Sequence, residues 1–200
     1  MADIPLPVAP TDFVMRLSGT RQTWQPLTGT IRSNILRGAR TEVELSFDPI
    51  AGADQRNLAA LFARVLIGQD RIMVPFAKLG YQRRGTGGPF TVADMASEAT
   101  ASLELAGDGT IEDADILQIG TAIHLATSKY QRGASLTTMA QIGVWPPLRA
   151  DVPSAAPIEA VTPMGIYVIG QQTPDIFRVT SRDPHTHLWN GSNSVTLVEA

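Results

Sequence analysis

The stretch GADQRNLAALFARVLIG, residues Gly52–Gly68, carries the clearest helical pattern in the chain. Its large apolar residues recur at intervals of three and four, which places them on one helix face: Leu58, Leu61, Phe62, Val65 and Leu66. We expect Asp54 to cap the start of the helix and Gly68, which tolerates a left-handed conformation, to end it. The sequence therefore predicts an amphipathic helix over residues 54–66 whose apolar face packs on a sheet.

Most of the remaining chain has the alternation and turn residues of short β-strands. The segment Glu42–Phe47 places Val43, Leu45 and Phe47 on one face and polar residues on the other, which is typical of a half-buried strand. Gly165–Ile169 is apolar on both faces, so we expect a central strand. Further strands are predicted at Asp12–Leu17, Trp24–Leu36, Arg71–Phe76, Ala101–Leu105, Ile116–Ile119, Ala122–Thr127, Ser135–Trp145, Asp175–Thr180 and Val195–Val198. The predicted fold is mainly β, with sandwich or small-barrel lobes and one amphipathic helix on the N-terminal sheet.

Turn and loop residues divide this pattern into two lobes. The glycine-rich segment Gly80–Pro89 separates the two halves of the chain, and Gly107-Asp108-Gly109 is predicted to be a turn. We expect an N-terminal lobe over residues 1–96 and a C-terminal lobe over residues 97–200. The last strand is free to return to the first lobe. Met1–Pro10 contains three prolines and is expected to be an extended arm, either frayed or docked on a neighbouring subunit.

Composition excludes several classes of protein. The 200 residues are 44% hydrophobic and 18% charged, which is too apolar for a disordered chain. The net charge of −3 argues against nucleic acid as the main partner. The absence of cysteine excludes disulfides, thiolate metal sites and cysteine nucleophiles. No apolar run approaches the ~20 residues of a membrane span, and the N-terminus lacks the pattern of a secretory signal.

Three polar clusters are candidates for chemistry. The acidic group Asp108, Glu112, Asp113 and Asp115 is either a solvated turn or a calcium site, but its spacing does not match an EF-hand loop. His185 and His187 are spaced to share one ion if they lie in a strand, yet no third ligand is identifiable near Asp183. His124, between apolar residues, is expected to be a structural residue. We predict no metal site from these clusters.

The glycine-rich loop Gly85–Gly88 has two readings. It lacks the lysine and hydroxyl residue of a phosphate-binding loop, so we expect either a flexible hairpin tip or a place where Arg83 and Arg84 meet an anion or an acidic partner. The sequence also lacks GxSxG and HExxH motifs. We therefore predict no enzymatic activity and no cofactor.

Several landmarks, taken in order, resemble a known family. They are Trp24-Gln25-Pro26-Leu27, LAALFARVLIGQDRIMVPF (58–76), DADILQIGTAIHLATSKY (113–130), GASLTTMAQIGVWPPLRA (133–150) and Asp175-Ile176-Phe177-Arg178-Val179. This order resembles the distal tail proteins and related minor tail proteins of long-tailed, siphovirus-like bacteriophages and gene transfer agents. The segment Trp145–Arg149, which stops a long strand, is the most characteristic landmark.

The resemblance implies a structural protein of the virion tail tip, made in the host cytoplasm. Proteins of this kind form a ring, commonly a hexamer, that links the tail tube to the hub and receptor-binding tip. Basic turns would then meet acidic faces such as Asp108–Asp115 on the next copy. The candidate contact residues are Arg37, Arg40, Arg83, Arg84 and Trp189. The implied partners are the chain itself, the tail tube protein and the hub or tip proteins.

Two other functions stay open at the level of sequence. A β-sandwich that binds carbohydrate or a host surface molecule would use exposed aromatic residues, and Trp189 and Tyr130 are the candidates. The other is an enzyme acting on cell-wall glycan or peptide, and glycan hydrolysis would need two carboxylates ~5–9 Å apart in a cleft.

Overall fold

The structure is a computed structural model that describes residues 1–18, 21–24, 32–35, 39–47, 50–131, 140–170, 188–189 and 194–200. It confirms a mainly β fold with one helix packed on a sheet. The chain forms two compact units. Unit 1 comprises Met1–Arg16, Glu42–Tyr81 and Met164–Ala200, and unit 2 comprises Leu17–Thr41 and Gln82–Pro163.

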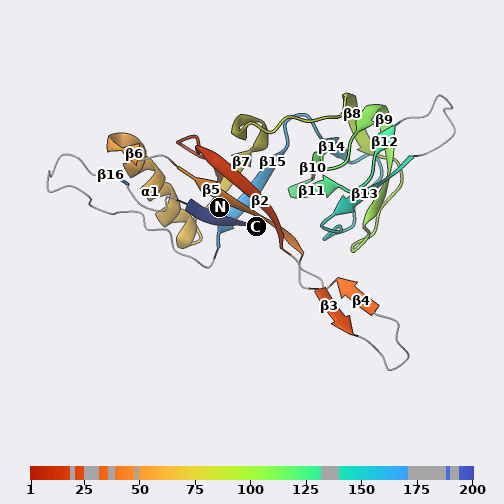
Figure 1. Cartoon of the computed structure of the whole chain (residues 1–200), viewed down its shortest axis with the longest axis horizontal. Helices are drawn as coiled ribbons and strands as arrows, with labels where there is room; N and C mark the ends of the chain where they lie inside the picture. The colour runs from red at the N-terminus through yellow and green to blue at the C-terminus, as the bar shows by residue number, and fades with distance from the viewer. Residues whose placement is uncertain are drawn as a thin grey trace. The chain divides into compact units, whose positions relative to one another are not determined.

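Unit 1 is built on a six-stranded mixed sheet (Figure 1) with the order β1-β7-β15-β17-β5-β2. The strands are β1 (Ala2–Pro5), β2 (Asp12–Ser18), β5 (Arg40–Ser46), β7 (Asp70–Pro75), β15 (Met164–Ile169) and β17 (Ser194–Glu199). β1 pairs with β7 in parallel, whereas the pairs β7–β15, β15–β17 and β17–β5 are antiparallel. The sheet therefore joins strands from both ends of the chain.

The alternation of β5 and the central place of β15 agree with the sequence. Val43, Leu45 and Phe47 are buried, and the intervening residues of β5 are only half-buried. β15 lies between β7 and β17, which explains why apolar residues occupy both of its faces. β7 ends at Pro75, which lacks the N–H needed to continue the ladder.

The helix α1 (Gly52–Leu66) lies against β7 and β15, as Figure 1 shows. Leu58, Leu61, Phe62 and Val65 are buried as predicted, and Gly68 has a φ of 74°. Leu66 departs from the prediction. It is 44% exposed, because the buried face of the helix ends at its neighbour Val65. The helix also begins at Gly52, so Asp54 lies within its first turn instead of capping it.

Aromatic side chains complete the core of unit 1. A 3-10 turn, η1 (Phe76–Leu79), follows β7 and buries Phe76. The Phe76 ring meets the buried Tyr167 ring edge-on at 6.4 Å, and the Phe13 ring of β2 at 6.3 Å. These contacts tie the outer strand β2 to the centre of the sheet.

Two small two-stranded sheets accompany the larger ones. β6 (Ile50–Ala51) pairs with β16 (Leu188–Trp189), and β3 (Arg21–Trp24) pairs with β4 (Arg32–Ile35). The second pair resolves the extended segment predicted at Trp24–Leu36 into a hairpin that is inserted between β2 and β5 along the chain.

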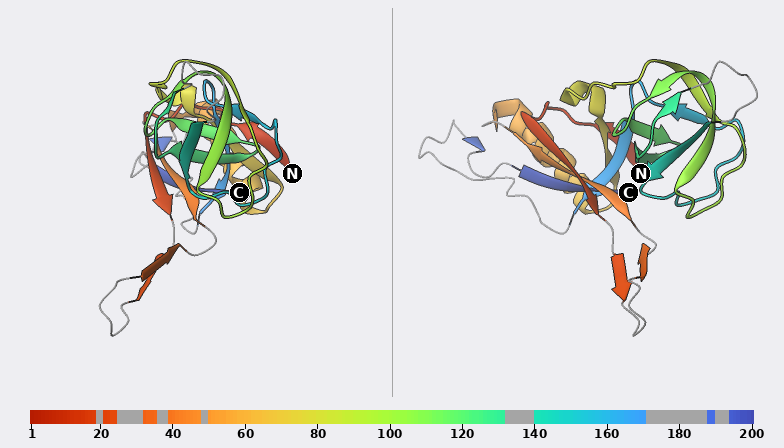
Figure 2. Two further views of the ribbon diagram at one scale, coloured as in Figure 1. Left: turned by 90° about the vertical axis from the view of Figure 1, so that its right-hand side faces the viewer. Right: turned by 45° about the vertical axis from the view of Figure 1, so that its right-hand side comes forward.

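Unit 2 contains a closed six-stranded antiparallel barrel, whose strands curl around a common interior in Figure 2. The barrel order is β9-β13-β11-β10-β14-β8, and β8 closes the ring by pairing with β9 as well as with β14. The strands are β8 (Gly87–Val92), β9 (Ser102–Ile111), β10 (Ile116–Ile119), β11 (Ala122–Ala126), β13 (Ala140–Trp145) and β14 (Pro157–Glu159), with the short β12 (Tyr130–Gln131) added beside β9. The interior is filled by apolar residues from all of these barrel strands.

The turn predicted at residues 107–109 is wrong, because β9 continues through it to Ile111. Gly107 and Gly109 both have a φ of 147°, a conformation that other residues rarely adopt. A Cβ on Gly107 would lie 2.5 Å from the Pro89 carbonyl oxygen of β8. These glycines let β8 cross β9 closely enough to close the barrel.

The structural division also differs from the predicted lobes at residues 1–96 and 97–200. Unit 2 begins its barrel segment at Gln82, and the chain returns to unit 1 at Met164. β17 pairs with β5, so the last strand does return to the first sheet. Met1–Pro10 likewise contributes β1 to its own sheet. The reason in each case is strand pairing between distant segments, which local composition does not reveal.

Some sequence predictions lie outside the described residues. They include the strand predicted at residues 175–180 and the pair His185 and His187. They also include residues 135–139, the first part of the strand predicted at residues 135–145, whose second part is β13. Among the described residues, no helix combines the length and hydropathy needed to span a lipid bilayer.

Candidate functional site: interaction surfaces

Among the described residues, the sheet of unit 1 ends at β1 on one side and at β2 on the other, whereas the barrel closes on itself. β2 is the last strand on one side, and in the described part of the chain no strand pairs with its outer edge. It is seven residues long, and its Val14 is 45% exposed. Arg16 of β2 bonds Glu44 of β5 at 2.6 Å, which holds the strand on the sheet. An outer strand of this kind presents N–H and C=O groups that can pair with another chain.

The opposite edge, β1, is shorter and better protected. It has four residues and ends in Pro5, which offers no N–H group. Arg71 of β7 donates to the Asp3 carboxylate at 2.7 Å, so a side-chain pair reinforces the parallel ladder. Of the two edges, β2 is therefore the better candidate for pairing with a second chain.

The β3–β4 hairpin is a second candidate contact element. Its register pairs Arg21 with Ile35 and Trp24 with Arg32, so each of its strands carries one arginine. Within the described residues, neither strand pairs with any other strand. Two-stranded hairpins are marginally stable in water without further packing.

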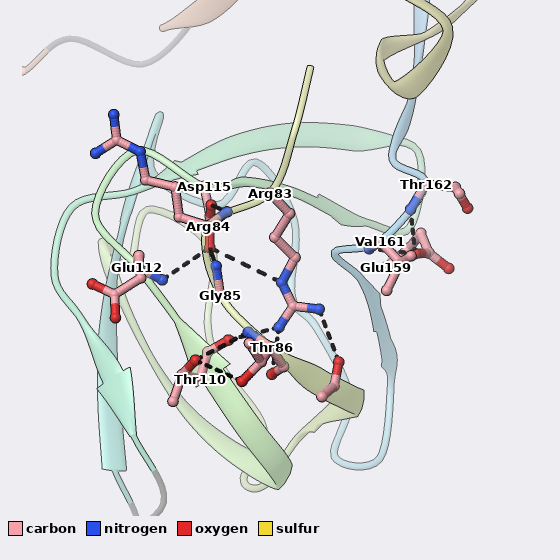
Figure 3. A network of polar contacts seen from close by, with 11 residues as sticks. Arg83, Arg84, Gly85, Thr86, Thr110, Glu112, Asp115, Glu159, Val161 and Thr162 are labelled. Atoms are coloured by element: carbon pink, nitrogen blue, oxygen red, sulfur yellow. Dashed lines mark hydrogen bonds and ion pairs between the residues drawn. The ribbon is translucent and has the colours of Figure 1, made fainter. Parts of the chain in front are cut away.

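The loop before β8 is folded against the barrel instead of being a free tip (Figure 3). The Arg83 side chain is only 8% exposed, and its guanidinium donates to three carbonyl oxygens: Gly87 at 2.8 Å, Thr86 at 3.0 Å and Thr110 at 2.6 Å. The same guanidinium lies 5.0 Å from the centre of the Phe90 ring. Arg83 is thus used inside its own unit and is a poor candidate for a partner contact.

Asp115 holds the other side of this loop. Its carboxylate is 1% exposed and accepts backbone hydrogen bonds from Arg84 at 2.8 Å, Gly85 at 3.0 Å and Glu112 at 2.9 Å. The Arg83 Nε lies 4.0 Å from Asp115 Oδ2, which adds a buried opposite charge. Backbone N–H donors and a nearby cation offset the cost of removing a carboxylate from water. Asp115 is therefore a structural anchor and departs from the solvated turn expected for this acidic cluster.

Gly85 explains why this loop is rich in glycine. A Cβ at this position would lie 2.1 Å from the Thr110 carbonyl oxygen and 2.9 Å from Asp115 Oδ2. The loop backbone thus runs directly against β9, and only glycine fits there without a shift of the backbone.

The rest of the acidic cluster lies on the barrel surface. Glu112 pairs with Lys129 at 2.6 Å, and this hydrogen bond raises the pKa of the Lys129 ammonium above 10.5. Asp108 and Asp113 are exposed. Arg84 is also exposed, and Figure 3 shows its side chain directed away from the Arg83 network. Among the candidate contact residues in this region, Arg84 is the one that is placed to meet a partner.

The other three candidate contact residues are Arg40, Trp189 and Arg37. Arg40 is exposed at the start of β5. Trp189 lies in β16, where its register partner is Ile50. Arg37 lies outside the described residues. Of the candidates that the structure describes, only Arg83 and Arg84 lie in the same loop.

The remaining candidates for chemistry have structural roles. His124 is 1% exposed, and its Nδ1 donates to the Pro146 carbonyl oxygen at 2.6 Å, as expected for a structural histidine. Tyr130, a candidate sugar platform, is 2% exposed and donates to the Gly107 carbonyl oxygen at 3.0 Å. Its ring packs edge-on against Phe90 at 5.7 Å. In the part of the chain that the structure describes, no group of three His, Asp or Glu residues is arranged to hold a metal ion.

No protein-family model and no curated protein matches the sequence. Inference about function therefore starts from the open sheet edge, the hairpin and the resemblance of the sequence landmarks.

Sequence reasoning missed two features of these surfaces. The hairpin was not separated into two strands, although the Pro26 and Gly29 of its connecting segment are turn residues. The open edge at β2 had no local signal, because an edge is defined by which distant strands pair and not by the strand itself.

Proposed function

We propose that this protein is a structural, ring-forming component of the distal tail of a long-tailed bacteriophage or gene transfer agent. In this role it links the tail tube to the hub or receptor-binding tip. The order of sequence landmarks supports the tail as its location. The observation that carries its assembly role is the open six-stranded sheet, which ends in the seven-residue strand β2.

A ring requires two different surfaces on each copy, so that each copy contacts the next in the same way. The sheet of unit 1 has two unlike edges, a short proline-ended β1 and a longer β2. The chain also carries the β3–β4 hairpin between β2 and β5. These unlike surfaces support a head-to-tail contact between copies over a symmetric dimer.

A binding module for carbohydrate is less favoured by the described residues. Tyr130 is buried and its hydroxyl donates a hydrogen bond to the Gly107 carbonyl oxygen, so it does not form an exposed aromatic platform.

The proposal is tested by locating the protein in particles and measuring its assembly. Antibody against the chain should label one end of the tails in electron micrographs of purified particles. Mass photometry of the isolated protein should show a species at about six times the chain mass of 21.4 kDa, alone or after addition of tube protein. A chain that is absent from particles and stays monomeric in both conditions would refute the proposal.

A further inference from the structure

The β3–β4 hairpin belongs to a segment of uniform charge. Residues 17–41 contain no aspartate, glutamate or lysine, and all of their charges are arginines: Arg21, Arg32, Arg37 and Arg40. In the described part of this segment, β3 and β4 pair only with each other. A marginally stable hairpin with one sign of charge gains most from an acidic surface that it can pack on.

The barrel of the same chain carries the opposite charge. Residues 85–128 contain no lysine or arginine, and their charges are all acidic: Asp94, Glu98, Glu104, Asp108, Glu112, Asp113 and Asp115. Asp115 is buried and used by the backbone, and Glu112 is paired with Lys129. Four of the others are exposed on the surface: Asp94, Glu98, Asp108 and Asp113. Across the whole segment 82–163, nine acidic residues outnumber five lysines and arginines, so the barrel segment has a net negative charge.

We propose that the arginine-bearing β3–β4 hairpin of one copy docks on the acidic surface of the barrel of a second copy. This inference rests on the proposed function and names the surfaces that its subunits use. The hairpin and the barrel are different surfaces, so their contact is head-to-tail and can propagate around a ring. A second copy is favoured over nucleic acid, because the chain as a whole has a net charge of −3.

Charge reversal in the hairpin gives the first test. Arg21→Glu/Arg32→Glu should weaken self-association by about tenfold or more, because attractive pairs become repulsive. Sedimentation velocity at 50 and 500 mM NaCl measures this constant, and wild-type association should weaken with salt. The matched control is Arg56→Glu/Lys78→Glu, which makes the same change of charge at exposed residues of α1 and η1 and should associate as wild type does.

A mixing experiment then identifies the partner surface. Asp94→Lys/Asp113→Lys reverses two exposed charges of the barrel and should weaken self-association in the same way. An equal mixture of the hairpin variant and the barrel variant should regain association. In the mixture, each reversed hairpin meets a reversed barrel, and each native hairpin meets a native barrel. Circular dichroism checks that both variants remain folded.

Each contrary outcome has a separate meaning. If the hairpin variant forms the wild-type assembly, the docking inference is overturned while the ring survives. If reversal leaves self-association unchanged but abolishes retention on an immobilised DNA oligonucleotide, the hairpin binds nucleic acid and the inference fails. Wild-type protein that is monomeric at every concentration also overturns it. Absence of the protein from tails is what would remove the proposed function.

Discussion

The two β systems of this chain end in opposite ways. In unit 2, β8 pairs with both β14 and β9, so six strands close on themselves and leave no edge in that ring. In unit 1, the described strands form a sheet whose outer members are β1 and β2. A closed ring satisfies its own backbone, whereas an open sheet leaves a row of donors and acceptors at its margin. The barrel strands therefore have no free edge in their ring with which to pair another chain, whereas β2 of the sheet is a candidate for such pairing.

The largest expected effect is a loss of stability when the buried carboxylate beside the barrel is removed. Replacing Asp115 with alanine removes the acceptor of three backbone N–H groups and leaves the buried Arg83 charge without its carboxylate. We expect the free energy of unfolding to fall by about 3–5 kcal/mol, as when one partner of a buried pair is removed. Urea denaturation followed by circular dichroism measures the loss.

Asp113→Ala is the matched control, since it removes an exposed carboxylate two residues away. Its effect should stay within about 0.5 kcal/mol. Equal losses of unfolding free energy for the two variants would show that Asp115 does not anchor the loop. The barrel would then not owe part of its stability to this buried carboxylate.

The next effect concerns the open edge. Val14→Lys places a charge at an exposed apolar position of β2, which is how natural edge strands discourage pairing. We expect self-association to weaken by roughly tenfold, with the stability of the single copy within about 0.5 kcal/mol of wild type. Analytical ultracentrifugation and thermal denaturation measure the two quantities.

Leu66→Lys provides the comparison for that variant, because Leu66 is exposed to nearly the same degree, 44% against 45%. It lies at the end of α1 and not in an edge strand, so the variant should leave association unchanged. If both variants weaken association alike, general surface charge is responsible and β2 has no special role.

The smallest effect concerns the surface pair of Lys129 and Glu112. The hydrogen bond from Lys129 to Glu112 raises the pKa of the ammonium above its usual 10.5 in the folded state. A raised pKa means that the pair contributes stability fully below pH 10.5 and loses it as the pH rises through the folded pKa. The midpoint of urea denaturation should therefore differ slightly between wild type and Lys129→Gln below pH 10.5, and this difference should vanish above the folded pKa of Lys129.

Lys78→Gln serves as the reference for this titration, because it removes an exposed lysine from another part of the chain. A difference between wild type and Lys129→Gln that persists unchanged above the folded pKa would mean that the pair's charge does not stabilise the barrel surface.

Local patterns predicted the parts of the fold that depend on local rules. The spacing of Leu58, Leu61, Phe62 and Val65 locates α1, and the alternation of β5 indicates its buried face. Where the sequence failed, long-range contact had overridden the local signal. Gly107 and Gly109 are turn residues by composition, yet they serve the close crossing of β8 and β9.

The candidate surfaces were predicted less well than the fold. Arg83 and Arg84 are adjacent in sequence, but one is buried among carbonyl oxygens and the other is exposed. Their difference depends on Thr110 and Asp115, which lie far along the chain.

The register between β7 and β15 has a consequence for how such a chain diversifies. Pro75 and Met164 are direct partners in adjacent antiparallel strands, so the points where the chain leaves and re-enters this sheet are only about 5 Å apart. The unit 2 segment Gln82–Pro163 is therefore joined to this sheet like a long loop between two paired strands, once η1 has added Phe76 to the core of unit 1. We expect that this segment can be exchanged for another domain, or replaced by a short connection, while the host sheet keeps its strand order.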